Sequence, residues 1–403
     1  MPASPSTARA INDRLALRLL QQEGSLTAGQ LKQLTGLSRP TVADLVERLT
    51  AAGLIAMVGE SGEQRRGPNA RLYGIVADRA HLAALDVRTE GVSVVVSDLL
   101  GAELGRASVP IADDTGTGPA VEQAVTLVER AAKEAGAERL HTVGIGAPGL
   151  IDPATGELRD SSGLPEWHRR LVAALQERLP ARVIVENETN LAALAEQRDG
   201  AARDRDTFVL LWLGHGTGAA VVLDGRLRRG ASGGTGEIGF LPVPGTAALP
   251  SATDCEGGFH SLAGAAAIAE LAAGYGLVAP VSPGEPQAAA LVREAVATVS
   301  SPSLSPSFSS GADRFLSALA DRLAIGAASV VAVLDPGCVV LGGEVGQAGG
   351  DVLAARVGER LVRMSPLPVE VRASTLGGGA VLRGALLTAR DGAQNDLFAP
   401  HPH

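Results

Sequence analysis

The sequence predicts an α/β protein in which a small N-terminal domain of helices and a hairpin precedes a larger body of two similar lobes. Three observations lead to this prediction. Apolar side chains recur at helical spacing over residues 11–53, a strand-pair pattern occurs at 82–101 and again at 208–225, and Ala/Leu-rich helical stretches separate the strands of the body. A chain of 403 residues is long enough for two or three domains with their own cores.

Composition narrows the class of protein. Hydrophobic residues make up 45% of the chain, which indicates a globular fold, and aromatic residues only 2%, so Ala, Val and Leu must fill the cores. The two cysteines, Cys255 and Cys338, cannot build a disulfide framework, which fits a reducing cytoplasm. The N-terminus lacks the apolar segment of a signal peptide, and Asp335-Pro336 interrupts the longest apolar stretch, so we expect neither secretion nor a membrane span.

Capping residues mark the ends of three helices near the N-terminus. The first helix ends at Gly24. Thr27 is the expected N-cap of the second helix, which stops at Gly36, and Ser38 is the expected N-cap of the third, which ends near Gly53. The two later helices and the short turn between them have the spacing of a helix-turn-helix.

A hairpin follows these helices. Residues 54–58 and 71–75 read as strands, and the polar segment 59–70 joins them as the tip of a wing. The order of helices and hairpin predicts a winged helix-turn-helix domain, which we place at residues 1–76.

Small polar and cationic side chains at the start of the third helix are those that a DNA-reading helix needs, and Ser38, Arg39 and Thr41 supply them. Arg65 and Arg66 in the wing are placed to reach phosphates or a minor groove. The first 74 residues carry nine Lys/Arg against six Asp/Glu, whereas the rest carries 26 against 38, so the basic end indicates a polyanionic partner. The alternative is a winged module that contacts only protein.

The body repeats one theme. Each half has two strands joined by a polar or Gly-rich turn and closed by a turn that contains Asp98 or Asp224, and VGIGAPGLID at 143–152 is echoed by CVVLGGEVG at 338–346. Two copies of strand–strand–strand–helix–strand–helix make the ribonuclease-H-like architecture of actin and hexokinase, whose ligands bind between the lobes. We therefore expect lobes at 77–200 and 201–403, with 377–390 returning to the first lobe.

The remaining segments are assigned from composition. Ala/Leu-rich helices are expected at 119–136, 165–179, 188–200, 257–276, 312–334 and 377–389. The Ser-rich stretch 300–311 reads as a surface insertion, and residues 391–403 as a frayed tail whose two histidines form no metal site.

A glycine-rich turn and a following carboxylate identify the family. Gly214, Gly216 and Gly218 flank Thr217 between two apolar runs, and backbone without Cβ atoms can cradle phosphate-sized anions. With Glu237 in the Gly-Glu-Ile-Gly segment, this stretch resembles the second half of the ROK family (repressors, open reading frames and sugar kinases). The predicted helix-turn-helix and wing likewise resemble the MarR-like winged domain of ROK repressors, and the resemblance to the family covers roughly residues 8–390.

The resemblance implies two binding sites. Matching the family's sugar-binding segments, we expect sugar contacts from Gly163, Asn187, Glu188, Glu237 and His260. The nucleotide-binding positions of the family fall on Gly214, Gly216, Thr217 and Gly218 and on Gly342 and Gly343, which we interpret as inherited turns that no longer serve ATP.

Four departures from the family's kinases argue against catalysis. Asp86-Val87-Arg88-Thr89-Glu90 replaces the phosphate loop Asp-x-Gly-Gly-Thr, and Glu188 replaces the catalytic Asp, displacing the carboxylate by about an ångström. Phe240 replaces the family's metal-binding His, and the zinc motif is absent, leaving only Cys255. We therefore expect no catalytic residue, no zinc and no ATP.

These inferences combine into one hypothesis: a cytoplasmic sugar-responsive repressor of carbohydrate uptake or metabolism genes, acting as a homodimer or dimer of dimers on operator DNA. One alternative is an ATP-dependent hexose kinase with an added DNA-binding module. Another is a regulator that senses a protein partner through an apolar surface containing Phe240 and Phe259.

Overall fold

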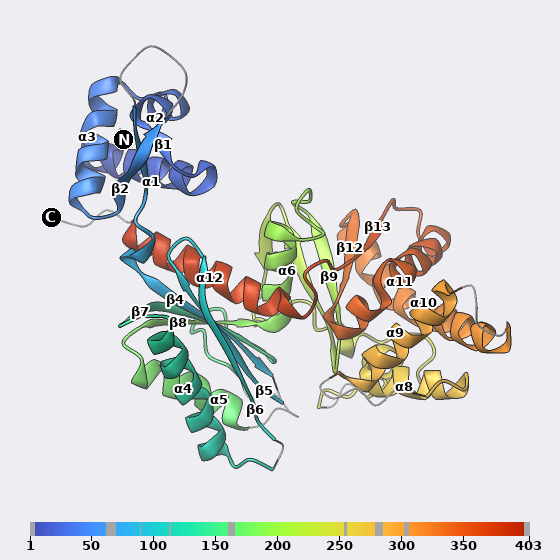
Figure 1. Cartoon of the computed structure of the whole chain (residues 1–403). Helices are drawn as coiled ribbons and strands as arrows, with labels where there is room; N and C mark the ends of the chain where they lie inside the picture. The colour runs from blue at the N-terminus through green and yellow to red at the C-terminus, as the bar shows by residue number, and fades with distance from the viewer. Residues whose placement is uncertain are drawn as a thin grey trace.

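The computed structural model describes residues 5–61, 70–88, 90–112, 114–159, 166–253, 256–278, 285–301 and 306–398. Figure 1 shows a small N-terminal domain beside two larger lobes, each built on a sheet covered by helices.

The N-terminal domain is a winged helix-turn-helix, as predicted. Its elements are α1 (Pro5–Glu23), β1 (Leu26–Thr27), α2 (Ala28–Thr35), α3 (Arg39–Ala51), β2 (Ile55–Ser61) and β3 (Ala70–Ile75). The strands form a sheet of order β1-β3-β2. Thr27 caps α2 in a capping box with Gln30, and Gly36 ends α2 in the left-handed region at φ 70°, so local chemistry alone defines this helix.

The first lobe contains a five-stranded sheet of order β6-β5-β4-β7-β8. Its strands are β4 (His81–Arg88), β5 (Gly91–Asp98), β6 (Glu103–Pro110), β7 (Leu140–Ala147) and β8 (Arg182–Asn187). The core on one face includes α4 (Thr117–Glu134) and α5 (Glu166–Arg178), and the core on the other includes α6 (Glu188–Asp199) and α12 (Ala380–Leu397). The short turn η1 (Ala77–Arg79) leads into β4.

The second lobe repeats this arrangement. Its sheet has the order β11-β10-β9-β12-β13, with antiparallel β9–β10 and β10–β11 pairs and parallel β9–β12 and β12–β13 pairs. The strands are β9 (Phe208–Leu213), β10 (Thr217–Leu223), β11 (Arg226–Arg228), β12 (Cys338–Gly342) and β13 (Glu370–Ala373). The same order and directions occur in the first sheet, which confirms the predicted duplication.

Helices of the second lobe enclose its own core. They are α7 (His260–Ala263), α8 (Ala265–Gly274), α9 (Gln287–Ser300), α10 (Pro306–Leu334) and α11 (Gly343–Met364), with the short turns η2 (Ile238–Phe240) and η3 (Gly377–Gly379). By length and composition the stretch Ser310–Leu334 of α10 could cross a membrane, yet half of it is buried. Phe315, Leu319 and Leu323 are fully buried in this core, as in a core helix of a globular lobe.

Three sequence-based assignments are wrong. The helix expected over 257–276 is two helices, because the backbone at Gly264 is extended (ψ 161°) and ends α7. The expected surface insertion 300–311 contains the beginning of α10, where Pro306 occupies the first helical position, a place that proline favours. The expected frayed tail is helical to Leu397, because tertiary packing buries Ala393 and Phe398. Composition also missed α9 and α11.

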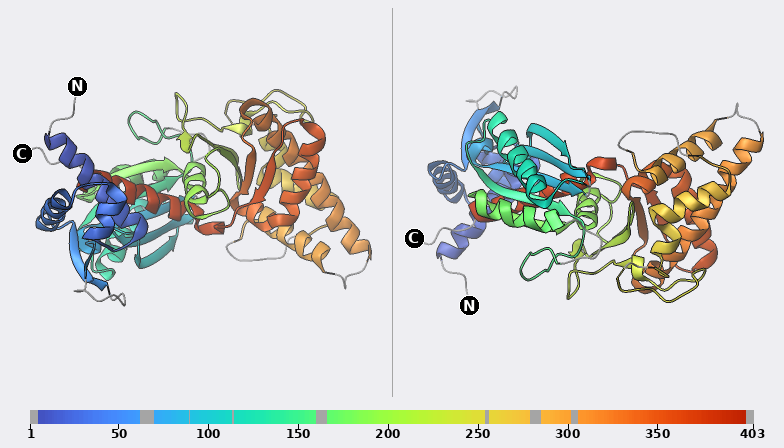
Figure 2. Two further views of the ribbon diagram at one scale, coloured as in Figure 1. Left: turned by 90° about the horizontal axis from the view of Figure 1, so that it is seen from above. Right: turned by 90° about the horizontal axis from the view of Figure 1, so that it is seen from below.

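Helix α12 extends from the junction of the two lobes to the winged domain, as Figures 1 and 2 show. Near its C-terminal end, Asn395 accepts a hydrogen bond from Arg14 of α1, and the Gln394 side chain donates to the Leu99 carbonyl at 3.2 Å. One helix therefore contacts both the body and the N-terminal domain.

Candidate functional site

The junction of the lobes brings together the ends of β4 and β8, the start of α6 and the β9–β10 hairpin. Asn187 is the last residue of β8 and the N-cap of α6: its Oδ1 accepts from the Thr189 amide at 2.8 Å, and its Nδ2 donates to the Gly149 carbonyl at 3.0 Å. Asn187 therefore fixes both the start of α6 and the strand-end loop beside it.

Glu188 is the first residue of α6 and lies in a negative environment. Burial, together with the carboxylates of Asp86 and Glu344, raises the pKa of Glu188 to about 8. Its side chain is only partly accessible to solvent. Since neutral pH lies below that value, Glu188 is mainly protonated there and can donate a hydrogen bond.

Arg88 connects the two lobes. Its Nε lies 2.9 Å from Asp86 Oδ2 on β4, and its Nη1 lies 2.9 Å from Glu344 Oε1 at the start of α11. Asp86 is buried, and within the described ranges its Oδ1 has no hydrogen-bond partner. We call Asp86, Arg88, Glu188 and Glu344 the Glu188 cluster. The sequence alone shows Arg88 only as part of a departure from the family's phosphate loop, and it does not predict the ion pairs of Arg88 with Asp86 and Glu344.

The glycine-rich hairpin lies directly against the Glu188 cluster. Leu213 pairs with Thr217, and the Gly214 amide donates to the Gly216 carbonyl at 3.1 Å. A Cβ at Gly214 would stand 2.6 Å from Glu344 Oε2, so only glycine lets this carboxylate approach. Gly342 ends β12 and Gly343 begins α11, and a Cβ at Gly343 would stand 2.5 Å from the Leu213 carbonyl oxygen. The expected nucleotide positions are thus close together, and packing requires glycine at Gly343, whereas a Cβ at Gly216 would meet no atom within 4 Å.

A second ion pair flanks Asn187. The buried carboxylate of Glu186 lies 2.6 Å from Arg229 and accepts a hydrogen bond from Asn190 Nδ2 at 2.9 Å. Sequence reasoning named neither Glu186 nor Arg229. The only signal was the position of Glu186 immediately before the Asn187-Glu188 pair.

Glu237 lies near the same loop as Asn187. A Cβ at Gly234 would stand 3.6 Å from Leu150 and 3.7 Å from the Glu237 Cγ, so Leu150 and Glu237 both lie beside Gly234. Burial raises the pKa of Glu237, although its side chain is exposed to solvent. A raised pKa and an exposed side chain occur together when a carboxylate faces solvent but has protein close on several sides.

The other expected sugar contacts are placed differently. His260 lies near the hairpin residue His215; burial and that histidine lower the pKa of His260. No hydrogen bond in the described part of the chain joins His260 to Asn187, Glu188 or Glu237. Gly163 lies outside the described residues.

Phe259 is fully buried in the core of the second lobe, so the expected apolar contact surface containing it is wrong. Phe240, in η2, is partly buried. Cys255, the remnant of the family's zinc motif, lies outside the described residues, and within the described ranges no group of three His, Cys, Asp or Glu side chains is arranged to hold a metal ion.

At the start of α3, Ser38 and Arg39 are exposed to solvent and Thr41 is partly buried. Ser38 Oγ accepts from the Thr41 amide at 3.3 Å and lies 2.8 Å from Thr41 Oγ1, so both polar groups are engaged at the start of α3. Arg39 is exposed at the first position of α3. Arg65 and Arg66 lie outside the described residues.

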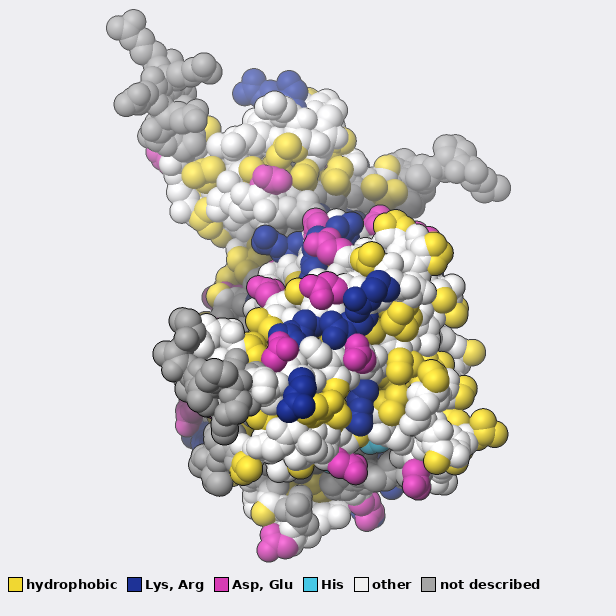
Figure 3. Space-filling view, turned by 90° about the vertical axis from the view of Figure 1, so that its right-hand side faces the viewer, with side chains coloured by type: hydrophobic (Ala, Val, Ile, Leu, Met, Phe, Trp, Pro, Cys, Tyr) yellow, Lys and Arg dark blue, Asp and Glu magenta, His cyan; other side chains and the backbone are white. Residues whose placement is uncertain are grey.

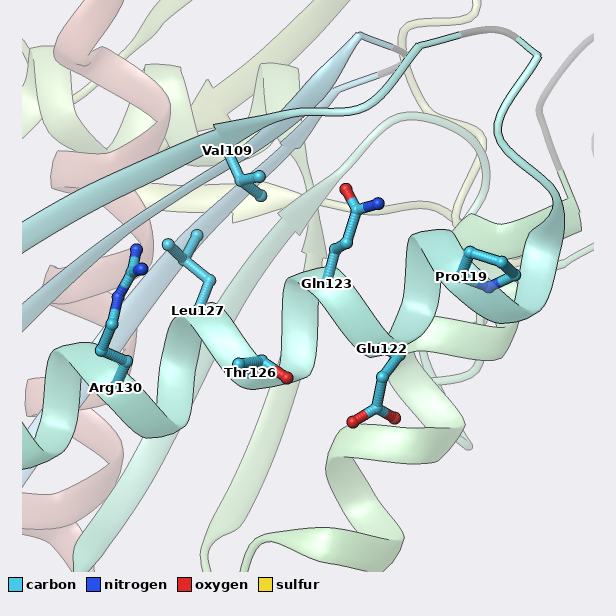
Figure 4. Close-up of a pocket in the computed structure, with 7 residues that line it drawn as sticks. All are labelled: Val109, Pro119, Glu122, Gln123, Thr126, Leu127 and Arg130. Carbon is cyan, nitrogen blue, oxygen red and sulfur yellow. The ribbon is translucent and has the colours of Figure 1, made fainter.

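Two other surfaces do not belong to this site. An open hollow between β6 and α4 on the first lobe is drawn in Figure 4; it is lined by Val109, Pro119, Glu122, Gln123, Thr126, Leu127 and Arg130. Figure 3 shows a face of the second lobe on which positive and negative side chains are interspersed. Ion pairs such as Arg356–Asp313 and Arg360–Asp321, both 2.7 Å, join α11 to α10 in this lobe, and the face drawn lacks the single-sign patch of a nucleic-acid surface.

Comparison with known families decides the identity of the body. The ROK family profile matches residues 83–391, and a winged helix-turn-helix DNA-binding profile matches residues 9–56. The chain belongs to the ROK family. Its N-terminal domain is of the DNA-binding winged type, as the sequence predicted.

Relatives of this ROK protein include both regulators and kinases. The DNA-binding transcriptional dual regulator NagC of Escherichia coli K12 is 26% identical over 243 residues, 58% of each chain. The xylose repressor of Bacillus subtilis 168 is 23% identical over 251 residues, 60% of this chain and 62% of the repressor. The glucokinase of Thermotoga maritima is 31% identical over 232 residues, 55% of this chain and 68% of the kinase. The matches thus span less than two thirds of both regulators.

Comparison with solved structures shows which proteins share this fold. A ROK family transcriptional regulator, a homologue of the E. coli MLC protein, superimposes with a TM-score of 0.74 at 20% identity and covers 97% of this chain and 98% of its own. The ROK hexokinase of Thermus thermophilus gives a TM-score of 0.61 at 30% identity, over 78% of this chain and 99% of the hexokinase. The regulator match includes the winged domain because it spans nearly the whole chain.

Proposed function

We propose that this ROK protein is a sugar-responsive transcriptional repressor of carbohydrate uptake or metabolism genes. The observation that carries the proposal is a DNA-binding winged domain that α12 joins to a two-lobed body. In that body, Arg88 and Glu344 form an ion pair at the expected phosphate position. The NagC and xylose repressor relatives support the same function.

Loss of kinase activity is part of the proposal. Phosphoryl transfer depends on positioning and on stabilising negative charge. Here the Glu344 carboxylate lies against Gly214 of the hairpin, where it repels phosphate, and Glu188 at the position of the catalytic base is mainly protonated at neutral pH. Both features oppose catalysis.

For DNA binding, we propose that α3 enters the major groove and that two copies of the chain read a palindromic operator in the cytoplasm. The effector releases DNA by binding the released conformation more tightly than the DNA-bound one. Arg39, Arg65 and Arg66 are the proposed phosphate and base contacts, and Ser38 and Thr41 hold the start of α3.

Fluorescence anisotropy with the protein's own upstream DNA tests this function. Arg39→Ala, and separately Arg65→Ala with Arg66→Ala, should each weaken binding about 10-fold or more, since such a contact contributes about 1–3 kcal/mol. Arg106→Ala is the matched control: Arg106 is an exposed arginine of β6, outside the winged domain, and is paired with Glu103 at 2.7 Å. Equal affinities for all four proteins would contradict the proposal.

A hexose kinase is the second candidate, favoured by the 31% identity to the Thermotoga maritima glucokinase. This candidate predicts ADP release with glucose or mannose, and loss of that release in Glu188→Gln. We expect no release above a no-enzyme blank; turnover that Glu188→Gln abolishes would establish the kinase instead.

A further inference from the structure

The arginines at the lobe junction are already neutralised. Arg88 is shared between Asp86 and Glu344, at 2.9 Å each, and Arg229 lies 2.6 Å from Glu186. A phosphorylated ligand needs cationic side chains or bare amides that are free to meet its charge. Binding a phosphate here requires breaking one of these ion pairs and leaving a buried carboxylate without its partner, which is costly.

A carboxylate also lies beside the first glycine of the hairpin turn. Glu344 Oε2 would be 2.6 Å from a Cβ at Gly214, so an anion stands next to the turn that in the family's kinases faces phosphate. Negative charge already occupies this position, and a second negative charge would be repelled.

One buried carboxylate oxygen at the junction has no partner. In the described part of the chain, Asp86 Oδ1 is buried and accepts no hydrogen bond, and the Asp86 carboxylate acts electrostatically on Glu188. Buried polar atoms without partners are uncommon, and a ligand hydroxyl or amine would satisfy this acceptor.

We propose that the Glu188 cluster, with Asn187 and Glu237, recognises an unphosphorylated sugar, prefers an amine-bearing sugar to its hydroxyl counterpart, and excludes sugar phosphates and nucleotides. This inference rests on the proposed sugar response and specifies its ligand. Its basis is that carboxyl groups supply the free acceptors of the site while every arginine described there is already paired.

Isothermal titration calorimetry on the full chain tests the order of affinities. The probes are glucose, glucosamine and glucose 6-phosphate; mannose, N-acetylglucosamine and their 6-phosphates; xylose; and the nucleotide analogue AMP-PNP. For whichever scaffold binds, the 6-phosphate should be at least 10-fold weaker, glucosamine should bind more tightly than glucose, and AMP-PNP should give no heat.

Removing a carboxylate charge from the site should weaken the discrimination against sugar phosphates. Glu237→Gln should reduce the ratio of the affinities for a sugar and its 6-phosphate several-fold. Glu103 is an exposed carboxylate on β6, so the control Glu103→Gln should leave this ratio unchanged. Circular dichroism melts check that both variants fold.

Three results would overturn the inference: a sugar phosphate that binds as tightly as its parent sugar, AMP-PNP binding in the wild type, or no binding of any sugar in the panel. None of these outcomes affects specific operator binding by anisotropy. Failure of the repressor assignment would instead appear as loss of that DNA binding.

Discussion

At Glu188, the environment and not the residue type decides the charge. Burial disfavours the carboxylate, and Asp86 and Glu344 add like charges, so the proton is retained to a pKa of about 8. Burial likewise raises the pKa of Asp86, an effect that Arg88 opposes. The surroundings of Glu188 therefore make the residue at the family's base position a hydrogen-bond donor.

The free energy of unfolding should fall as the pH rises from 4.5 to about 8. The folded protein keeps a proton on Glu188 between its ordinary pKa of 4.5 and about 8, whereas the unfolded chain has released it. Stability contributed by the neutral group is therefore lost progressively across that window. Glu188→Gln should flatten the dependence, measured by urea unfolding at pH 5, 6.5 and 8. Parallel curves for the wild type and the variant would show that Glu188 does not titrate there.

Removing Arg88 should separate the lobes. Arg88→Met leaves Asp86 and Glu344 as unpaired like charges, at a cost of about 1–3 kcal/mol because the pair is partly solvated. Small-angle scattering should give a larger radius of gyration for Arg88→Met than for the control Arg106→Met. An unchanged radius would show that other contacts hold the lobes together.

Among the elements, α6 depends on a contact that no local rule predicts. Glu196 is fully buried and accepts from the Ala201 amide at 2.6 Å, the Ser374 hydroxyl at 2.5 Å and the Leu376 amide at 3.2 Å. A single carboxylate thus joins the end of α6 to the segment that leads into α12. The periodicity of α6 reveals a helix but not this partner 178 residues away.

Glu196→Ala should destabilise the chain by about 3 kcal/mol or more, because several buried donors lose their acceptor. Glu196→Gln keeps the shape and one acceptor oxygen, so its cost should be smaller. Chemical denaturation measures both against Glu134→Ala, an exposed residue 3.9 Å from Arg130. Equal stability of Glu196→Ala and the control would exclude a structural role for this carboxylate.

For the whole molecule, α12 is the feature that links the lobe junction and the winged domain. It follows η3, where the Gly378 carbonyl lies 3.5 Å from Arg88 Nη2, and near its other end Asn395 contacts Arg14 of α1. Phe398, directly after α12, is buried in a core cluster that also contains residues of α1. A change at the junction therefore has a continuous path to the winged domain.

Loosening the distal end of α12 should free the winged domain. Phe398→Ala removes a buried ring, which typically costs about 3–5 kcal/mol locally, and should raise amide hydrogen exchange in α1. Val362→Ala on α11, where the side chain is 75% exposed, should leave exchange in α1 unchanged. Identical exchange in the two variants would show that α12 does not hold α1.

What the sequence determined by itself is local or repeated. Thr27, Gly36 and Ser38 define α2 and the start of α3 through bonds within a few residues, and the repeated strand pattern predicts two equivalent sheets. The helix expected at 188–200 likewise begins at Glu188. The roles of Arg39, Asn187 and Glu237 in binding stay predictions.

Only the tertiary structure decided the contacts between distant segments. Arg88 meets Glu344 across 256 residues, Glu196 meets Ser374, and α12 extends into the expected tail because packing buries Phe398. Capping and periodicity depend on neighbours along the chain. The charge of Glu188 and the path to the winged domain depend on neighbours in space, and folding alone brings these together.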